Sequence, residues 1–198
     1  RHFTKAKSET SVRQVDVSGL GEEDIRRIRR DVLNTRGELL FARAVVLFEG
    51  ETEEQALPIF AKQYFGQEPF ALGVAMVNVG GYGNYKAFLR LVTGMGIPWL
   101  IFSDAEPDVK PKVERQVEGL TGGKIVFLPN GRDFEAYLLQ SGYEDCVRAA
   151  FLELELPTEP HPTNRAAKER EAKGKTTAEL GQWLDSNKTQ AAPKVAEQ

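Results

Sequence analysis

The stretch AVVLFEGETE, residues 44–53, decides the fold. Its first five residues are all apolar, which predicts a short strand buried on both faces of a sheet. Glu49 and Gly50 end that strand, and a helix is predicted from Thr52, with Gln55 three residues later as the partner in a capping box. The stretch therefore predicts a strand, a tight turn and a helix that begins with acidic residues.

The same alternation of strand and helix continues toward the C-terminus. Three further apolar runs predict strands, and each is separated from the next by a segment with the apolar spacing of a helix. This order is typical of an α/β fold with a parallel sheet flanked by helices on both faces. The predicted strands are 72–77, 98–102 and 124–128, and the predicted helices between them are 52–64, 84–95 and 109–120.

The flanking segments are less regular. Residues 1–10 are polar and are expected to lack fixed structure, 12–17 alternate like a strand, and 22–41 have the spacing of a helix, with Val32 on its apolar side. Residues 155–172 are rich in proline, threonine and charge, which predicts a linker or arm. Further helices are predicted at 133–140, 143–154 and 177–186, and the last forms a small C-terminal helical element. The expected division is 1–35 as a connector, 36–142 as the catalytic domain, and 143–198 as a helical region with a polar arm.

Composition excludes several classes of protein. The 198 residues carry a net charge of −3, so a protein that binds DNA through an overall basic surface is not expected. Cys146 is the one cysteine, which rules out an internal disulfide and favours a cytoplasmic location. No apolar run approaches the ~20 residues that span a bilayer, so no membrane partner is expected. Locally, residues 161–175 contain five basic and two acidic residues.

Acidic residues follow two of the predicted strands. Glu49 comes directly after the first strand, and Asp104 and Glu106 follow the third. Because the carboxyl ends of parallel strands share one edge of the sheet, these acids are expected to crowd together unless a cation lies between them. Oxygen-rich sites of this kind suit Mg²⁺ or Mn²⁺. Three further acids can reach the same edge: Glu53, Asp133 and Glu135.

These motifs together resemble the Toprim domain. The resemblance rests on Glu49-Gly50-x-x-Glu53 after a strand, Gly80-Gly81 before a helix, and Asp104-x-Glu106 after another strand. The sequence from Leu39 onward is most similar to that of the OLD (overcoming lysogenization defect) family of nucleases. Where Toprim domains usually carry Asp-x-Asp, this chain has Glu106 as the second acid.

The resemblance implies a function and a larger protein. It implies the C-terminal nuclease region of an ATPase–nuclease whose N-terminal ATPase domain lies elsewhere, and no Walker A motif occurs in residues 1–198. It implies Mg²⁺- or Mn²⁺-dependent hydrolysis of DNA with two ions. It also implies a lysine from the C-terminal helical part that stabilises charge at the phosphate, for which Lys175 is preferred over Lys173.

The predicted roles of the site residues follow from this scheme. Glu49, Asp104 and Glu106 are expected to hold the first ion, and Glu53 with Asp133 or Glu135 the second. The possible supporting residues are Ser103, Asp108 and Gly80, and the predicted DNA-binding residues are Arg165, Lys168 and Arg170.

Structural interpretations stand beside these roles. Glu49 and Glu53 are also explained as acids favoured at a helix start, Asp108 as a helix N-terminal acid, and Asp133 as a helix cap. At the level of function, the alternatives are another Toprim activity, such as a primase or RNA processing, and a non-catalytic Mg²⁺-binding receiver-like or docking module. A receiver domain needs a lysine after a later strand, and none follows residues 124–128 directly.

Overall fold

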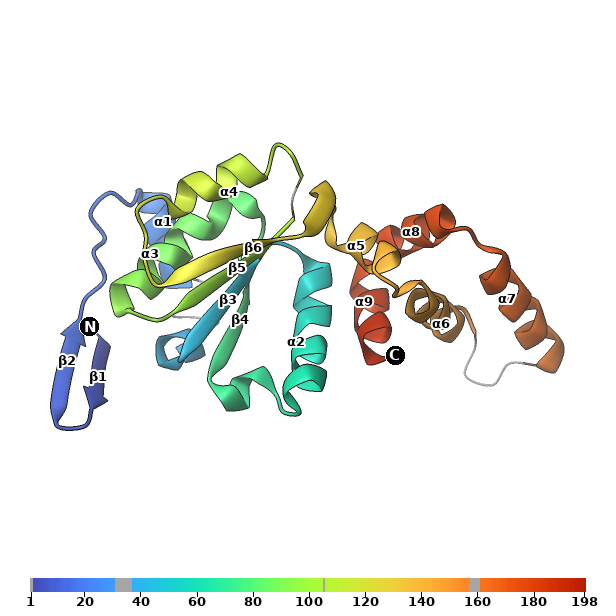
Figure 1. The fold of residues 1–198 in the computed structure, drawn as a ribbon, viewed down its shortest axis with the longest axis horizontal. Helices are drawn as coiled ribbons and strands as arrows, with labels where there is room; N and C mark the ends of the chain where they lie inside the picture. Colours follow the sequence, from blue (N-terminus) through green and yellow to red (C-terminus); the bar gives the residue numbers. More distant parts are fainter. Residues whose placement is uncertain (1, 31–36, 105, 157–160) are drawn as a thin grey trace.

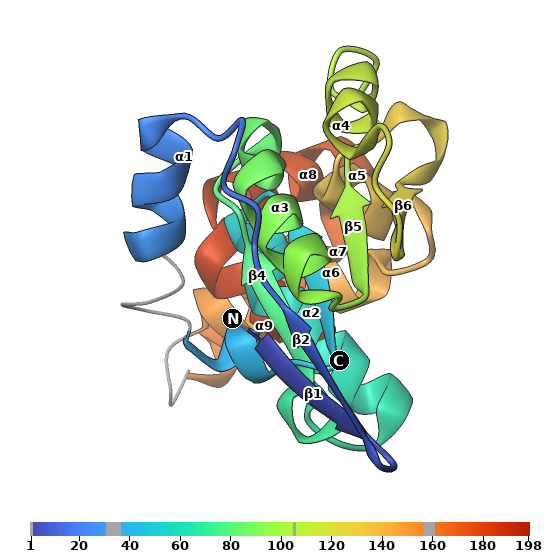
Figure 2. The same ribbon diagram turned by 90° about the vertical axis from the view of Figure 1, so that its left-hand side faces the viewer.

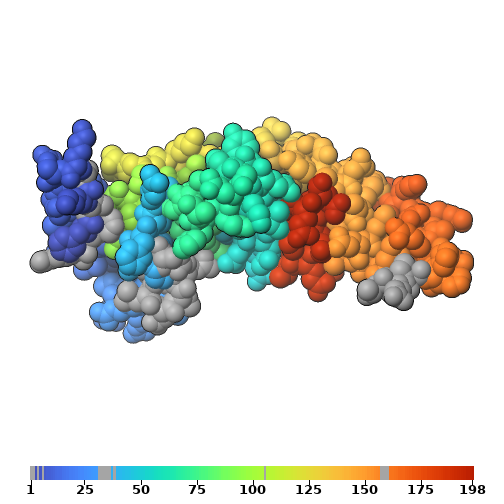
Figure 3. Space-filling view, turned by 90° about the horizontal axis from the view of Figure 1, so that it is seen from below, coloured from blue at the N-terminus to red at the C-terminus, as the bar shows by residue number. Residues whose placement is uncertain are grey.

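The computed structural model describes residues 2–30, 37–104, 106–156 and 161–198. The molecule is elongated, with a β-hairpin at one end, a sheet in the middle and a group of helices at the other end (Figure 1). The view from below shows the same order, from the hairpin to the C-terminal helices (Figure 3). None of the described helices combines the length and the apolar content needed to span a bilayer.

The sheet has four parallel strands in the order β4-β3-β5-β6. They are β3 (Ala44–Phe48), β4 (Val74–Asn78), β5 (Trp99–Ser103) and β6 (Gly123–Phe127). β3 lies at the centre, with Leu47 opposite Val77 of β4 on one side and Ile101 of β5 on the other. The predicted parallel α/β sheet is confirmed, and because β3 and β5 are neighbours in the sheet, Glu49 and Asp104 leave it at the same edge.

One face of the sheet is covered by the helices α1 (Glu22–Arg27), α3 (Tyr85–Met95) and α4 (Lys110–Val117). α1 and α3 lie side by side (Figure 2). α3 supplies most of the apolar side chains of the core on this face, which also contains Leu47 and Ile101. Both of these strand residues are completely buried, so the ends of β3 and β5 are rigidly held.

The other face carries α2 (Glu51–Phe65), whose apolar side joins a second core formed with the C-terminal helices. This core contains Ala56 of α2, Leu138, and Leu180, all with 1% exposure or less. The predicted boundary at residue 142 therefore separates helices that share one core. The helices are α5 (Phe134–Gln140), α6 (Glu144–Glu155), α7 (Pro162–Gly174), α8 (Thr177–Ser186) and α9 (Lys188–Glu197). Short 3₁₀ turns connect the elements: η2 (Gly37–Phe41), η3 (Pro69–Leu72), η4 (Tyr82–Asn84) and η5 (Pro129–Gly131).

The N-terminal predictions are partly wrong. β1 (His2–Ala6) and β2 (Glu9–Arg13) pair in an antiparallel hairpin, so residues 2–10 are ordered and the strand starts earlier than position 12. The two residues between Ala6 and Glu9 close the hairpin, and Lys7 takes the left-handed conformation that such turns require (φ 55°). The helix predicted over 22–41 is not continuous, because α1 is followed by a π turn and then by η2. The prediction for Val32 lies outside the described residues.

The C-terminal prediction of a linker is also wrong in part. Residues 162–174 form α7, because Pro162 occupies the first helical position, where a missing N–H costs least, and Ala172 is buried against the neighbouring helices. The part of the predicted linker at 157–160 lies outside the described residues. α8 has the predicted bounds, and α9, which was not predicted, packs against α2 and α6.

Candidate metal centre

Glu49 follows β3 and is held by two hydroxyl groups. The Tyr85 hydroxyl donates a hydrogen bond to Glu49 Oε1 over 3.1 Å, and the Ser103 hydroxyl donates to the same oxygen. Tyr85 and Ser103 are both completely buried. Burial raises the pKa of Glu49 above its usual value despite these two bonds, and the charge of Glu106 raises it further. The carboxylate is therefore fixed in position at an energetic cost to its charged form.

Asp104 follows β5 at the same edge and lacks a partner for one oxygen. Its Oδ1 is buried and accepts no hydrogen bond from any described group. Burial, together with repulsion from the acids around it, raises the pKa of Asp104 to about 8. The repelling acids are Glu53, Glu49, Glu135 and Asp133. A buried carboxylate without a donor is unstable as a charge unless a cation approaches it.

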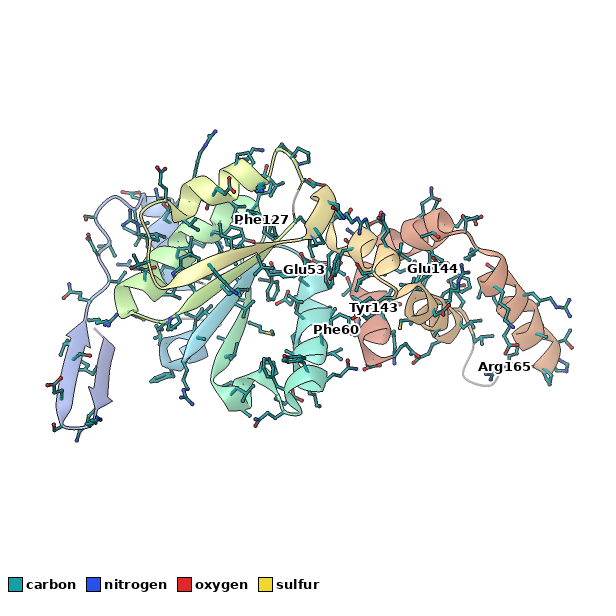
Figure 4. The ribbon with its side chains drawn as sticks, viewed as in Figure 1. Glu53, Phe60, Phe127, Tyr143, Glu144 and Arg165 are labelled. Atoms are coloured by element: carbon teal, nitrogen blue, oxygen red, sulfur yellow. The ribbon has the colours of Figure 1, made fainter. Side chains whose placement is uncertain are left out.

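Glu53 reaches the same edge from the first turn of α2. Its exposure is only 4%, and burial raises its pKa to about 7, with further repulsion from Glu135 and Glu49. The carboxylate lies over Gly50, the N-cap of α2, where a Cβ would stand 2.6 Å from Glu53 Oε2. Glycine at position 50 therefore leaves room for this acid. Figure 4 shows Glu53 at the end of α2 that faces α5.

Two more acids lie at the start of α5, and they differ in their hydrogen-bond partners. Asp133 is the N-cap, and its Oδ1 accepts a 2.7 Å hydrogen bond from the Ala136 backbone N–H. Glu135 is 6% exposed and accepts a 2.6 Å bond from the Thr52 hydroxyl. The capping box predicted for Thr52 is wrong, because Gly50 caps α2 and the Thr52 side chain turns toward Glu135 instead. Thr52 thereby ties α2 to α5 at the acidic edge.

Lys188, at the start of α9, places a cation beside these acids. Its Nζ lies 2.9 Å from Glu135 Oε1 and 3.3 Å from Asp185 Oδ1. Burial alone lowers the pKa of Lys188, but the two carboxylates outweigh this effect and raise it to about 12. Lys188 was not predicted from the sequence, because nothing in the polar segment around it signals contact with an acid more than 50 residues earlier.

The remaining predicted residues of the edge differ in their contacts. Glu106 is exposed and acts on Glu49 through charge. Asp108 is exposed and lies 3.2 Å from Lys112 in an ion pair, so its contact in the structure is on the surface of α4. Gly80 adopts the left-handed conformation (φ 71°) in the turn whose next residue, Gly81, donates its backbone N–H to the Glu49 carbonyl. This turn supports the backbone of Glu49.

A family model matches this part of the chain. It is described as "Overcoming lysogenization defect protein-like, TOPRIM domain", and it covers residues 40–105, which include β3, α2, β4, α3 and β5. Residues 40–105 are therefore similar to an OLD-like Toprim domain. The recognition from sequence is therefore confirmed, and the match contains the segment from Glu49 to Asp104.

One relative and two solved structures are also similar to the chain. The Escherichia coli (strain K12) protein "Uncharacterized protein YbjD" is 30% identical over 135 residues, which are 65% of this chain and 24% of that protein. The chain thus spans about a quarter of the length of this relative. The C-terminal region of the Burkholderia pseudomallei OLD protein has a TM-score of 0.56 at 20% identity, covering 79% of this chain and 88% of that one. The C-terminal region of the Xanthomonas campestris pv. campestris OLD protein has a TM-score of 0.57 at 20% identity, covering 81% and 86%. At this identity the two structures confirm the fold.

The predicted lysines lie away from the acids of the Toprim domain. Lys175 follows α7, with its Nζ 3.6 Å from Glu171 and 4.9 Å from the centre of the Phe151 ring. Lys173 is exposed in the last turn of the same helix. α7 lies at the outer end of the C-terminal helices, far from the start of α2 (Figure 1). The structure does not bring Lys173 or Lys175 to the acidic edge.

The predicted DNA-binding residues lie on α7 as well. Arg165 forms an exposed ion pair with Glu169 over 3.1 Å, and Figure 4 places it at the far end of the molecule. Lys168 contacts Glu155 over 3.4 Å and Glu171 over 3.0 Å. Arg170 is on the same helix. These cations therefore form part of a charged helix surface remote from the Toprim acids.

The donors at the acidic edge fit a hard divalent cation. They are carboxylate oxygens, which Mg²⁺ and Mn²⁺ prefer. As the side chains stand, no three His, Cys, Asp or Glu residues within the described ranges are gathered into a coordination sphere. Burial and mutual repulsion raise the pKa of Glu49, Glu53 and Asp104, and Asp104 Oδ1 has no described partner, so a cation would stabilise the charged forms of these acids.

Proposed function

We propose that this chain is the nuclease part of a larger ATPase–nuclease and that it hydrolyses DNA with divalent metal ions. The observation that carries the proposal is Asp104 Oδ1, a buried oxygen without a partner, surrounded by four other acids at the carboxyl edge of the sheet. Acids crowded in this way destabilise a fold unless they bind a cation. The OLD-like Toprim domain over residues 40–105 supports the same assignment.

The residues would divide between two ions, either Mg²⁺ or Mn²⁺. Glu49, Asp104 and Glu106 would hold the first, and Glu53 with Asp133 or Glu135 the second. Two such ions would supply activation of the attacking water and neutralisation of charge on the leaving oxygen of a phosphodiester. Asp133 is favoured over Glu135 for the second ion, because Glu135 is already bonded to Thr52 and Lys188.

Other residues of the chain position these acids. The hydroxyl groups of Tyr85 and Ser103 fix Glu49 Oε1, which leaves the other carboxylate oxygen for a ligand. Gly50 leaves room for Glu53 over the start of α2. Because these contacts come from buried groups on β5, α2 and α3, the acids require little reorganisation when an ion binds.

We further propose that Lys188 is the lysine that stabilises negative charge at the phosphate. Its ammonium lies beside Glu135 at the acidic edge, and it also acts on the charge of Glu53. Lys175 and Lys173, the residues preferred from sequence, are held on the remote side of the helical region. The Lys188 side chain is 43% exposed, so its ammonium would be accessible to a phosphate oxygen.

The wider setting is also a proposal. An N-terminal ATPase domain fits a chain that spans about a quarter of its relative's length. The α7 cations Arg165, Lys168 and Arg170 would contact DNA beyond the cutting site. The single cysteine is free, which fits a reducing cytoplasm. Residues 36–142 would form the catalytic domain and 143–198 the helical region that carries Lys188.

The direct test is cleavage of supercoiled plasmid in Mg²⁺ or Mn²⁺, with RNA as a comparison substrate. We expect Asp104→Asn to reduce the rate at least a hundred-fold, because it removes a charged ligand while preserving shape. The matched control is Asp108→Asn, an exposed acid four residues later whose loss should leave the rate unchanged. Equal rates for the parent and Asp104→Asn would contradict the proposal, and preferential cutting of RNA would favour an RNA-processing activity.

A further inference from the structure

A groove lined by aromatic side chains begins beside the acidic edge. It has a volume of about 480 Å³ and lies between α2, α5 and the end of β5. Aliphatic and amide groups complete its walls. The aromatic residues that line it are Phe60, Tyr64, Phe102, Phe134, Tyr137 and Tyr143.

Two of these rings are exposed to solvent. Tyr64 is 85% exposed and Tyr143 is 37% exposed. Phe60 and Tyr143 meet edge to face with their centres 5.7 Å apart, and Figure 4 shows them facing one another between α2 and the start of α6. Clustered exposed aromatic rings on a protein surface mark a binding site more often than a structural one. The groove is therefore suited to a ligand with flat apolar faces.

The chain connects the groove directly to the candidate metal centre. Phe102 is two residues before Asp104, and Phe134 lies between Asp133 and Glu135. Phe60 is seven residues after Glu53 on α2, which corresponds to about 10 Å along the helix axis. Stacked nucleotides repeat every ~3.4 Å along a strand, so about three nucleotides fit between the acids and the Phe60 ring.

The apolar surface continues past the groove along α2. A second cavity of about 500 Å³ is lined by Ala61 and Phe65 of α2 and by Leu100, which is two residues before Phe102 on the same face of β5. Lys124 of the neighbouring strand also lines it. Both cavities are therefore lined by residues of α2 and β5, the first by Phe60 and Phe102 and the second by Phe65 and Leu100.

We propose that this groove binds unpaired bases of the strand that is cut, so that the substrate is single-stranded or locally unwound DNA. The inference rests on the proposed nuclease function and adds the class of substrate to it. Base–aromatic stacking tolerates every base, because each has an apolar face. In a duplex the bases are stacked on one another, so their faces cannot enter a groove between helices.

The test measures binding and hydrolysis separately. Binding of fluorescent single-stranded and duplex oligonucleotides of one sequence is measured by anisotropy in Ca²⁺. Hydrolysis of bis(p-nitrophenyl) phosphate in Mn²⁺ by the parent reports the acidic centre without a strand. The groove variants are the double variants Tyr64→Ala/Tyr143→Ala and Tyr64→Phe/Tyr143→Phe. Phe70→Ala, which removes an exposed ring (76%) that does not line the groove, is the matched control.

We expect the parent to bind the single strand at least ten-fold more tightly than the duplex. The double alanine variant should lose about ten-fold in single-strand affinity, because each lost stack weakens binding, whereas the phenylalanine variant retains parental affinity. Phe70→Ala should bind as the parent does.

Three results would overturn the inference. They are equal affinity of the parent for the two oligonucleotides, single-strand affinity of the double alanine variant within two-fold of the parent, or a changed oligomeric state of that variant without a change in affinity. The last result would assign the groove to a protein partner. Failure of the nuclease proposal is distinguishable, because it appears as no hydrolysis of bis(p-nitrophenyl) phosphate by a parent that still binds the single strand.

Discussion

The acidic edge of the Toprim domain and the charged helix α7 hold the same residue types in opposite physical states. On α7 both acids, Glu169 and Glu171, have a cation within reach, and the pKa of Glu171 is lowered by its bond to Lys168. At the edge, burial and mutual repulsion raise the pKa of Glu53 to about 7 and of Asp104 to about 8. The acids of α7 are therefore in ion pairs, whereas Asp104 Oδ1 at the edge has no partner among the described groups. We therefore interpret α7 as a charged surface and the acidic edge as a binding site, and the predictions below test this difference.

The largest expected effect is stabilisation by metal. At a Ca²⁺ concentration about a thousand-fold above its dissociation constant, the free energy of unfolding should rise by about 4 kcal/mol, because the ion binds the folded acids and not the unfolded chain. Urea unfolding with and without Ca²⁺ measures this. Glu49→Gln/Asp104→Asn should abolish the effect, and the α7 double variant Glu169→Gln/Glu171→Gln should retain it. A parent that Ca²⁺ does not stabilise would remove the distinction between the two regions.

The next effect concerns the two groups of lysines. Lys188→Ala should slow plasmid cleavage ten- to hundred-fold, because it removes the cation beside Glu135. Lys175→Ala should change the rate less than two-fold, since that ammonium lies against Glu171 and Phe151. Initial rates at saturating Mn²⁺ compare the two variants. The opposite order would assign the catalytic lysine to the end of α7.

A smaller effect is expected from pH in the absence of metal. The folded-state pKa of Glu53 and Asp104 is raised, so from about pH 4 upward the unfolded chain releases these protons before the folded protein does. The stability that these groups contribute should therefore be fully present below about pH 4 and fall as the pH rises toward 8, by about 1–2 kcal/mol in total because water screens part of the repulsion.

Urea unfolding in EDTA across this range measures the trend. Glu53→Gln/Asp104→Asn should flatten it, and so should saturating Ca²⁺, since bound metal replaces the protons. If the double variant loses as much stability as the parent between pH 5 and pH 8, the acids at the edge are not under electrostatic strain.

The smallest effect is expected on α7 itself. Arg165→Ala should change the free energy of unfolding by less than about 0.5 kcal/mol, because its ion pair with Glu169 is exposed on both sides. A loss of more than 1 kcal/mol by thermal or urea unfolding would show that α7 is held by its charges and would make the two regions less different than proposed.

Elements that are determined by residues close together in the sequence were predicted correctly. The apolar run at 44–48, the acid at Glu49 and the glycine that follows were enough to place β3, the turn and α2, and parallel order placed Asp104 at the same edge. The hairpin at the N-terminus was missed because its strand residues are exposed and carry no burial pattern. α9 was missed because it contains Pro193 and several polar residues, which do not predict a helix from sequence. The helix is stabilised by packing against α2.

The site was predictable only where its residues follow strands. Thr52 was assigned to a cap because local spacing favours it, but the carboxylate that it bonds lies 83 positions later. Lys188 was missed for the same reason, since its contact with Glu135 exists only once α9 has packed against α2 and α6. Long-range pairs of this kind leave no pattern in a single sequence, whereas an acid that directly follows an apolar strand can be recognised in it.

The most direct test of the central claim is a crystal of this chain soaked in Mn²⁺ and measured for anomalous scattering. The account predicts ions at the carboxyl edge of the sheet, bound by Glu49 and Asp104 with Glu53 nearby, and none on α7. Ions bound elsewhere, with Asp104 Oδ1 still lacking a partner at saturating Mn²⁺, would contradict it.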